Sequence, residues 1–323
     1  MKFWSPLEGL YAEISNAGGF VNAHAHFDRA YTVTPEIMDL TKNHLFEKWQ
    51  LIDNIKKSRS VEEYSEGITK AIDMQKFYGV KSACTFIDID PIVGHKAIDG
   101  AISARNAAPD FNLKIACQTL KGVLNRESSD LIEDRMQDID IVGSLPGADK
   151  GYEEEHLDKV FEMALVYGKM LHVHVDQLNH PDEKETEMLA RKTIDWGMEG
   201  KVVAVHSISL ACHPKKYRKE VYKIAKDAGL MFISCPTAWI DHPRSEILVP
   251  SHNAITPVDE LLEHDLIVSI GSDNIHDIYK PYSNGDMYVE LRFLLEACKI
   301  YDLKTLKTIA VDNGLITSGI IKD

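Results

Sequence analysis

Short apolar runs rich in β-branched residues alternate with longer amphipathic stretches along most of the chain. We expect a strand in each of eight such runs: residues 19–26, 80–88, 113–120, 139–145, 170–175, 202–206, 230–235 and 266–271. Helical periodicity marks several of the intervening stretches, namely residues 61–77, 153–167, 183–198, 215–228 and 257–264. Ser60 and Thr256 stand just before two of these stretches and are expected to cap them.

The alternation of strands and helices predicts a parallel sheet. Eight such units in about 300 residues favour a closed (β/α)8 barrel of the TIM type over an open doubly wound sheet. An open sheet that binds a nucleotide would carry a phosphate loop, but neither G-x-G-x-x-G nor G-x-x-x-x-G-K-[ST] occurs. No linker or internal repeat divides the chain, so we expect residues 1–323 to form a single domain.

The composition narrows the partners that the protein can have. A formal net charge of −14 repels nucleic acid and anionic membranes, so we expect neither as a partner. The five cysteines are scattered singly, which argues against a disulfide framework and favours a cytoplasmic location. No apolar run approaches the roughly 20 residues needed to cross a bilayer. A small-molecule substrate fits this picture best, and a homo-oligomer remains open.

Pairs of histidines end two of the expected strands. In a parallel barrel, reactive side chains gather at the carboxyl ends of the strands. His24 and His26 end the first run, and residues two apart on a strand face the same side, so both can bind one metal ion. His172 and His174 end the fifth run. His172 would lie one layer deeper than His174, and either residue could supply a third ligand.

Two further strands end in residues suited to metal or proton chemistry. The sixth run ends at His206, and Ser272-Asp273-Asn274 follows the eighth run. Alone, His206 could be a core histidine bonded to a backbone carbonyl, and Asp273 could be a helix cap. Taken together with the histidines of the first and fifth strands, they predict a metal-dependent hydrolytic site at the barrel mouth.

The other histidines are not assigned to the metal site. Those in helices or turns are expected at the surface: His44, His95, His156 and His264. Those that follow the last four strands could each line the pocket, but most are expected to be loop residues: His180, His213, His242, His252 and His276.

This order of residues resembles the amidohydrolase superfamily and, within it, the cytosine deaminase-like group. The matching segments are GFVNAHAHFD at residues 19–28, VHVDQ at 173–177, AVHS at 204–207 and GSDN at 271–274. The resemblance implies that His24, His26, His174 and Asp273 hold one divalent metal ion, Zn or Fe. It also implies that His206 faces the attacking water or the reacting oxygen, and that Asp273 accepts the proton of that water.

The sequence departs from the group at four places. Gln177 stands where the deaminases carry a proton-shuttling Glu, and glutamine cannot carry a proton. Leu120 replaces a base-reading Gln, with Gln118 nearby, so cytosine is not expected as the substrate. Asn274 replaces the second Asp of an Asp-Asp pair. The small β-sandwich that usually accompanies the barrel is expected to be missing or vestigial.

The resemblance thus implies hydrolysis of a C–N bond in an amide, an amidine or an aminated heterocycle. Gln177 is assigned to the catalytic group with Asp273 and His206, whereas Asn274, Leu120 and Arg29 are assigned to substrate binding. Arg29 would clamp a carboxylate or a carbonyl, or it would be a surface or helix-start residue. One alternative is a binuclear, dihydroorotase-like hydrolase, although the fourth strand lacks the metal-bridging Lys until Lys150. The other alternative is a homologue that binds a ligand but is catalytically impaired.

Overall fold

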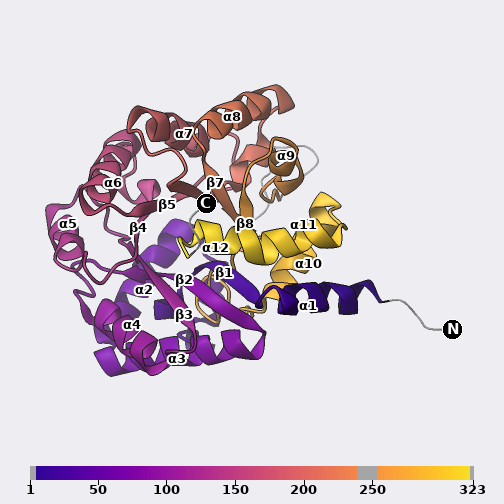
Figure 1. The fold of residues 1–323 in the computed structure, drawn as a ribbon. Coiled ribbons are helices and arrows are strands. Elements are labelled where there is room, and N and C mark those ends of the chain that lie inside the picture. Colours follow the sequence, from indigo (N-terminus) through magenta and orange to yellow (C-terminus); the bar gives the residue numbers. More distant parts are fainter. Residues whose placement is uncertain (1–4, 239–252, 321–323) are drawn as a thin grey trace.

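The computed structural model describes residues 5–238 and 253–320. Eight strands form one parallel sheet whose order follows the chain (Figure 1). They are β1 (Phe20–Ala25), β2 (Val80–Asp88), β3 (Asn112–Gln118), β4 (Ile141–Ser144), β5 (Met170–Val175), β6 (Val202–His206), β7 (Met231–Ser234) and β8 (Val268–Ile270). Each predicted run overlaps one of these strands, with β3 starting one residue before its run, and the predicted TIM-like barrel is confirmed.

Helices surround the sheet and connect its strands (Figure 1). They are α1 (Pro6–Asn16), α2 (Leu45–Ser58), α3 (Val61–Phe77), α4 (Lys96–Ala107), α5 (Arg126–Glu133), α6 (Glu153–Tyr167), α7 (Glu185–Asp195), α8 (Lys215–Asp227), α9 (Val258–Glu263), α10 (Met287–Cys298), α11 (Leu303–Lys307) and α12 (Asn313–Thr317). Ser60 caps α3 through a capping box with Glu63, as expected. None of the described helices combines the length and the hydrophobicity that a membrane crossing requires.

The barrel closes where the end of β1 meets the residues that follow β8. Ala25 and Asp273 form a parallel bridge there. The Asp273 N–H donates to the His24 carbonyl at 3.0 Å, and the His26 N–H donates to the Asp273 carbonyl at 3.2 Å. Gly271 lets the two segments approach, because a Cβ at this position would lie 2.6 Å from the His24 carbonyl oxygen. The closing contact therefore involves the same residues that the sequence marks for metal binding.

The buried side-chain amide of Asn22 stabilises this closing contact through hydrogen bonds. The Asn22 side chain donates to Gln75 Oε1 and to Ser272 Oγ, each at 2.8 Å, and accepts the Ser272 N–H at 3.0 Å. Gln75 belongs to α3 and donates in turn to the Gly285 carbonyl at 2.8 Å. Asn22 and Gln75 are both fully buried, so each polar group must find a partner inside the protein. The network ties β1, α3 and the segment after β8 together.

The opposite end of the barrel is plugged by the end of the described chain. α12 lies across the barrel in Figure 1, close to β1 and β8. Asn313 donates to the Val268 carbonyl at 2.8 Å, and the Thr317 carbonyl bonds to the ring of His172 at the same distance. The barrel is therefore open at one end, where the strands finish.

The described residues contain no second sheet. All eight named strands belong to the barrel, and the segment before β1 forms α1 instead of strands. α1 packs beside α11 on the outside of the barrel (Figure 1). Residues 5–238 and 253–320 therefore contain no β-sandwich.

The connection from β1 to β2 carries an additional helix. α3 packs against the barrel, whereas α2 reaches the open mouth and presents Leu45 and Trp49 to the space above the strand ends. A hydrophobic cluster at the barrel mouth joins Leu45 and Ile52 of α2 with Leu120, Leu145 and other residues. α2 thereby forms one wall of the site.

We expect Gly271→Ala to lower the free energy of unfolding by about 1–3 kcal/mol, because the added methyl group overpacks the β1–β8 contact. Urea unfolding followed by circular dichroism measures this change. Gly9→Ala is the control. Gly9 lies within α1, and a Cβ there would meet Leu303 of α11 at an ordinary contact distance of 3.5 Å. The control should be as stable as the parent or slightly more stable. Equal stability of the Gly271 variant and the parent would contradict the packing argument.

Candidate active site

The carboxylate of Asp273 lies against the two histidines of β1. Asp273 Oδ1 is 3.5 Å from His24 Nε2 and 3.3 Å from His26 Nε2. Two ligand atoms that lie about 2.1 Å from a tetrahedral metal ion are separated by about 3.4 Å. These spacings therefore match those of ligands around a single ion. Asp273 adopts a left-handed backbone conformation with φ +59°, which is uncommon for a residue with a side chain.

β5 contributes His174 rather than His172 to this group. The His174 ring lies 4.8 Å from that of His24 and 5.5 Å from that of His26, measured between centroids. His174 Nδ1 bonds to the Ser144 carbonyl at 3.0 Å, so it carries the proton and leaves Nε2 with a lone pair. His172 lies one layer deeper, where its Nε2 is taken up by the Thr317 carbonyl.

His206 completes the group from β6. Its ring centroid is 5.3 Å from that of His24 and 5.4 Å from that of His174. Its backbone has φ +76°, and its carbonyl accepts a hydrogen bond from the Thr256 hydroxyl at 2.6 Å. The expectation that Thr256 caps α9 is wrong: this helix has Pro257 at its N-cap and no side-chain cap, because the Thr256 hydroxyl is bonded to β6.

Burial and mutual contacts determine which of these groups are charged. It lowers the pKa of His24 to about 4 and that of His206 to about 3, and it lowers the pKa of His174 well below its usual value. Burial alone would raise the pKa of Asp273, but the contacts with His24 and His26 hold it well below the usual range. Near neutral pH the site therefore holds neutral imidazoles beside an ionised carboxylate, which is the protonation state that metal ligands need.

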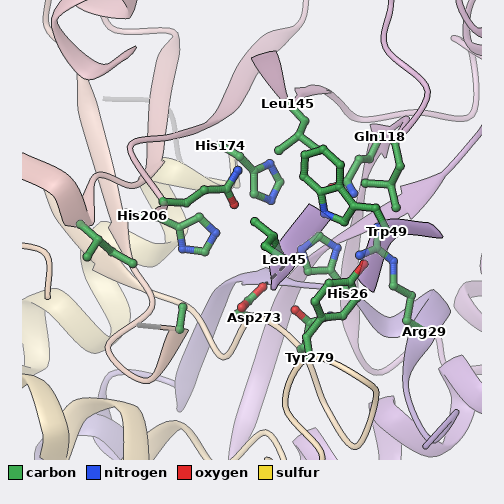
Figure 2. Close-up of a pocket in the computed structure, with 15 residues that line it drawn as sticks. His26, Arg29, Leu45, Trp49, Gln118, Leu145, His174, His206, Asp273 and Tyr279 are labelled. Atoms are coloured by element: carbon green, nitrogen blue, oxygen red, sulfur yellow. Dashed lines mark ion pairs between the residues drawn. The ribbon is translucent and has the colours of Figure 1, made fainter. Parts of the chain in front are cut away.

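The donor atoms fit a divalent metal ion. The candidate ligand atoms of His24, His26 and His174 lie within 4.8 Å of one another, and so do those of His24, His206 and Asp273. Among the described residues, both ring nitrogens of His24 and Nδ1 of His26 lack a hydrogen-bond partner although they are buried. Figure 2 shows His26, His174, His206 and Asp273 turned toward a common space. Buried unpaired nitrogens are costly unless something coordinates them.

A pocket extends from this cluster to α2. Its described lining residues are His26, Arg29, Leu45, Trp49, Gln118, Leu120, Leu145, His174, Gln177, His206, Ile208, Ala238, Asp273, Asn274 and Tyr279. The structure thus brings Gln177, Leu120, Asn274 and Arg29 to the same space as the candidate ligands. Asn274 is itself held by a hydrogen bond to Asp277.

Arg29 is a pocket residue and not a surface residue. Only 5% of it is exposed, and its Nη2 and Nε donate to the Asp88 carboxylate at 2.7 and 3.3 Å. Its guanidinium carbon also lies 5.4 Å from the centre of the Tyr279 ring. The two groups that hold Arg29 come from β2 and from the loop after β8.

Seven of the described pocket residues carry no assignment in the sequence analysis: Leu45, Trp49, Gln118, Leu145, Ile208, Ala238 and Tyr279. The sequence alone does not show which way Gln118 faces, because the orientation of its side chain depends on the register of β3. In the structure both Gln118 and Leu120 face the pocket. The length of the connection points to Leu45 and Trp49. More than 50 residues separate the first two strands, many more than an ordinary connection between strands needs, which indicates an inserted element near the mouth.

One histidine expected at the surface is buried. His156 is fully buried in α6, where its Nε2 bonds to Ser144 Oγ at 2.7 Å and its Nδ1 to Asp149 at 2.6 Å. His156 thereby supports the strand whose carbonyl orients His174, and the expectation of a surface position is wrong. His242 and His252 lie outside the described residues.

The sequence matches the profile of the amidohydrolase family over residues 18–310. The chain belongs to the amidohydrolase family. This assignment confirms the resemblance seen in the strand-end motifs, and it covers every residue of the cluster and the pocket.

Several proteins are similar to this amidohydrolase. An uncharacterized protein of Haemophilus influenzae is 44% identical over 255 residues, which cover 77% of this chain and 92% of the relative. The N-isopropylammelide isopropyl amidohydrolase of Pseudomonas sp. strain ADP is 27% identical over 307 residues, which cover 93% of this chain and 72% of the relative. The crystal structure of a Klebsiella pneumoniae 5-methylcytosine deaminase with 5-fluorocytosine shares the fold, with a TM-score of 0.86, 23% identity and coverage of 93% of this chain and 74% of that one.

We expect Thr256→Val to destabilise this amidohydrolase by about 1–3 kcal/mol, because the buried His206 carbonyl loses its hydrogen-bond donor. Chemical unfolding provides the measurement. Thr41→Val is the matched control, since its hydroxyl also donates to a carbonyl, that of Met38 at 2.6 Å, but at a partly exposed position. The control should stay within about 0.5 kcal/mol of the parent. Equal losses in the two variants would show that burial of the His206 carbonyl is not the cause.

Proposed function

We propose that the protein is a metal-dependent hydrolase that cleaves a C–N bond in a small amide, amidine or aminated nitrogen heterocycle. The observation that carries this proposal is the position of the Asp273 carboxylate, which shares one buried space with His24, His26, His174 and His206. The pocket beside this cluster supports a small-molecule substrate. Two relatives named for C–N chemistry, an amidohydrolase and a deaminase, are consistent with it.

His24, His26, His174 and Asp273 would hold one divalent ion, Zn or Fe, since imidazole and carboxylate suit both. When bound, such an ion supplies Lewis acidity and makes water a better nucleophile near neutral pH. The described part of β4 offers no Lys for a second ion, and Lys150 is exposed and absent from the pocket lining. These observations support a mononuclear centre over a binuclear one.

The protein's own residues would then carry the proton. Asp273 accepts a proton from the attacking water as the water oxygen bonds to the substrate carbon, and it returns this proton to the nitrogen that leaves when the C–N bond breaks. His206 faces the reacting oxygen and stabilises the charge that develops there. Gln177 borders the same pocket and can orient the substrate by hydrogen bonding, but it cannot relay the proton.

Gln177 also motivates a second candidate function. A protein that binds the metal and a ligand but turns over poorly would keep the cluster and lose the residue that passes a proton to a ring nitrogen. Release of ammonia or amine from a panel of cyclic amides and aminated heterocycles distinguishes the two functions, because sustained turnover of any member excludes the impaired homologue.

We expect the purified protein to hold one divalent ion per chain and His174→Gln to lose most of it, because the substitution removes an imidazole ligand. His172→Gln is the control, since its ring bonds to the Thr317 carbonyl and glutamine can still donate to that carbonyl. Elemental analysis of the dialysed proteins provides the measurement. Two ions per chain would favour a binuclear centre, and equal loss in both variants would remove His174 from the proposed ligand set.

Asp273→Asn should lower kcat by about 10²–10⁴-fold or more while the protein stays folded, because an amide cannot accept the proton. Amine release is measured beside a thermal unfolding curve. Asp110→Asn, an exposed carboxylate far from the pocket, is the matched control and should retain the parent rate. Undiminished turnover of Asp273→Asn would exclude the proposed role.

A further inference from the structure

One wall of the pocket is built around the carboxylate of Asp88. Arg29 donates to Asp88 Oδ1 through Nη2 and to Oδ2 through Nε. The Gln118 amide also donates to Oδ1, at 3.3 Å. Arg29 and Gln118 both line the pocket, whereas Asp88 is buried behind them. Figure 2 shows Arg29 and Gln118 beside Trp49, on the side of the pocket away from His206. Asp88 therefore sets the orientation of two polar groups that face the substrate space.

The ionisation of Asp88 determines which way the Gln118 amide points. Burial would raise the pKa of Asp88, but the charges of Arg29 and Lys56 hold it well below its usual range. An ionised carboxylate only accepts hydrogen bonds, so Gln118 must present Nε2 to it. The amide oxygen Oε1 then lies on the other side of the amide. This atom is buried and has no hydrogen-bond partner among the described residues, and Gln118 is only 2% exposed.

The charge of the Arg29 guanidinium is neutralised by neighbouring carboxylates, but one of its nitrogens can still donate a hydrogen bond. Asp88 and Asp90 face Arg29 and Lys56, and Lys56 Nζ contacts both carboxylates, at 3.1 Å in the case of Asp88. The two cations are thus paired with two carboxylates within the wall, and the buried Asp28 carboxyl lies beside them. Arg29 Nη1 forms no hydrogen bond to the residues that the structure describes. Arg29 can therefore donate to a neutral acceptor, whereas an additional carboxylate would meet a site already occupied by Asp88.

We propose that this wall recognises the uncharged N–H/C=O edge of a cyclic amide or imide. Gln118 Oε1 accepts from the ring N–H, and Arg29 Nη1 donates to the adjacent ring C=O. This inference rests on the proposed function and narrows its substrate class to oxo-substituted nitrogen heterocycles whose reacting carbon faces Asp273. The remaining wall fits such a ring, since Trp49, Leu120 and Leu145 present aromatic and apolar surface to it. Of the two roles considered for Arg29, the structure favours a carbonyl contact over a carboxylate clamp.

Three related rings test the proposal with the protein as purified. Uracil has N–H/C=O edges, 1,3-dimethyluracil has the same ring without N–H groups, and orotate is uracil with a carboxylate. Isothermal titration should show 1,3-dimethyluracil binding about tenfold or more weakly than uracil, because Gln118 Oε1 stays unpaired. Orotate should bind no more tightly than uracil. Similar affinities for uracil and its dimethyl derivative, or no binding of uracil up to its solubility, would overturn the proposal.

Variants separate the hydrogen bond from steric exclusion of the methyl groups. Gln118→Leu should weaken uracil by about tenfold and leave 1,3-dimethyluracil nearly unchanged, so that the preference is lost. Gln137→Leu, an exposed glutamine at the other end of the barrel, is the matched control and should keep the preference. Unfolding curves verify that both variants are folded, and the ligand series on the parent protein stands without them. A preference for orotate that disappears in Arg29→Gln would restore the carboxylate clamp.

Amine release distinguishes this proposal from the function on which it rests. Retained preference for uracil with no turnover of any substrate would keep the edge recognition and reject hydrolysis. Turnover of amides that lack an N–H/C=O edge, combined with no preference for uracil, would keep hydrolysis and reject the edge recognition.

Discussion

The contact between the end of β1 and the residues after β8 is the constraint on which the site depends. Parallel strands pair through their backbones, and the last pairing that closes this barrel runs through His24, His26 and Asp273. Side chains on such closely paired residues have little freedom of direction. The separations between the carboxylate and the two imidazoles are therefore set by the fold itself, and a glycine at position 271 makes the close approach possible.

Keeping several unpaired imidazoles in the interior carries an energetic cost, and hydrogen bonds to neighbouring buried groups hold the site in place despite it. The Asn22 network, the Ser144 carbonyl and the Thr256 hydroxyl each satisfy a buried polar group next to the site. His206 and Asp273 also occupy strained left-handed backbone conformations, which tend to persist only where neighbouring contacts enforce them. The rigid surroundings of the site therefore maintain the strained backbone conformations of His206 and Asp273.

The sequence predicted the strands well because burial on both faces leaves continuous apolar runs, and the polar residues that interrupt these runs mark the barrel mouth. It predicted His24, His26 and Asp273 as neighbours for the same reason. Helix-like stretches were harder to interpret. His156 lies in an ordinary amphipathic pattern, and only the three-dimensional contact with Ser144 shows that it is buried. Thr256 resembles a helix cap locally, but a long-range partner in β6 competes for its hydroxyl. Gln118 needed the register of β3, which no local pattern specifies.

The residues that line the pocket come from two kinds of element, the barrel strands with the loops that follow them and the inserted helix α2. The cluster beneath it is attached to strands whose positions are coupled around the whole barrel, so substitutions there disturb many contacts at once. Leu45 and Trp49 belong instead to a helix inserted between two strands, which packs on the mouth through a hydrophobic cluster with Leu120 and Leu145. Changes in this segment can reshape the roof over the substrate without displacing a strand. Divergence in substrate range should therefore concentrate at Leu45 and Trp49, at the start of α2, because Lys56 near its end is tied to Asp88 and Asp90. Substitution of the first turns alone offers a route to an altered substrate range on an unchanged reaction centre.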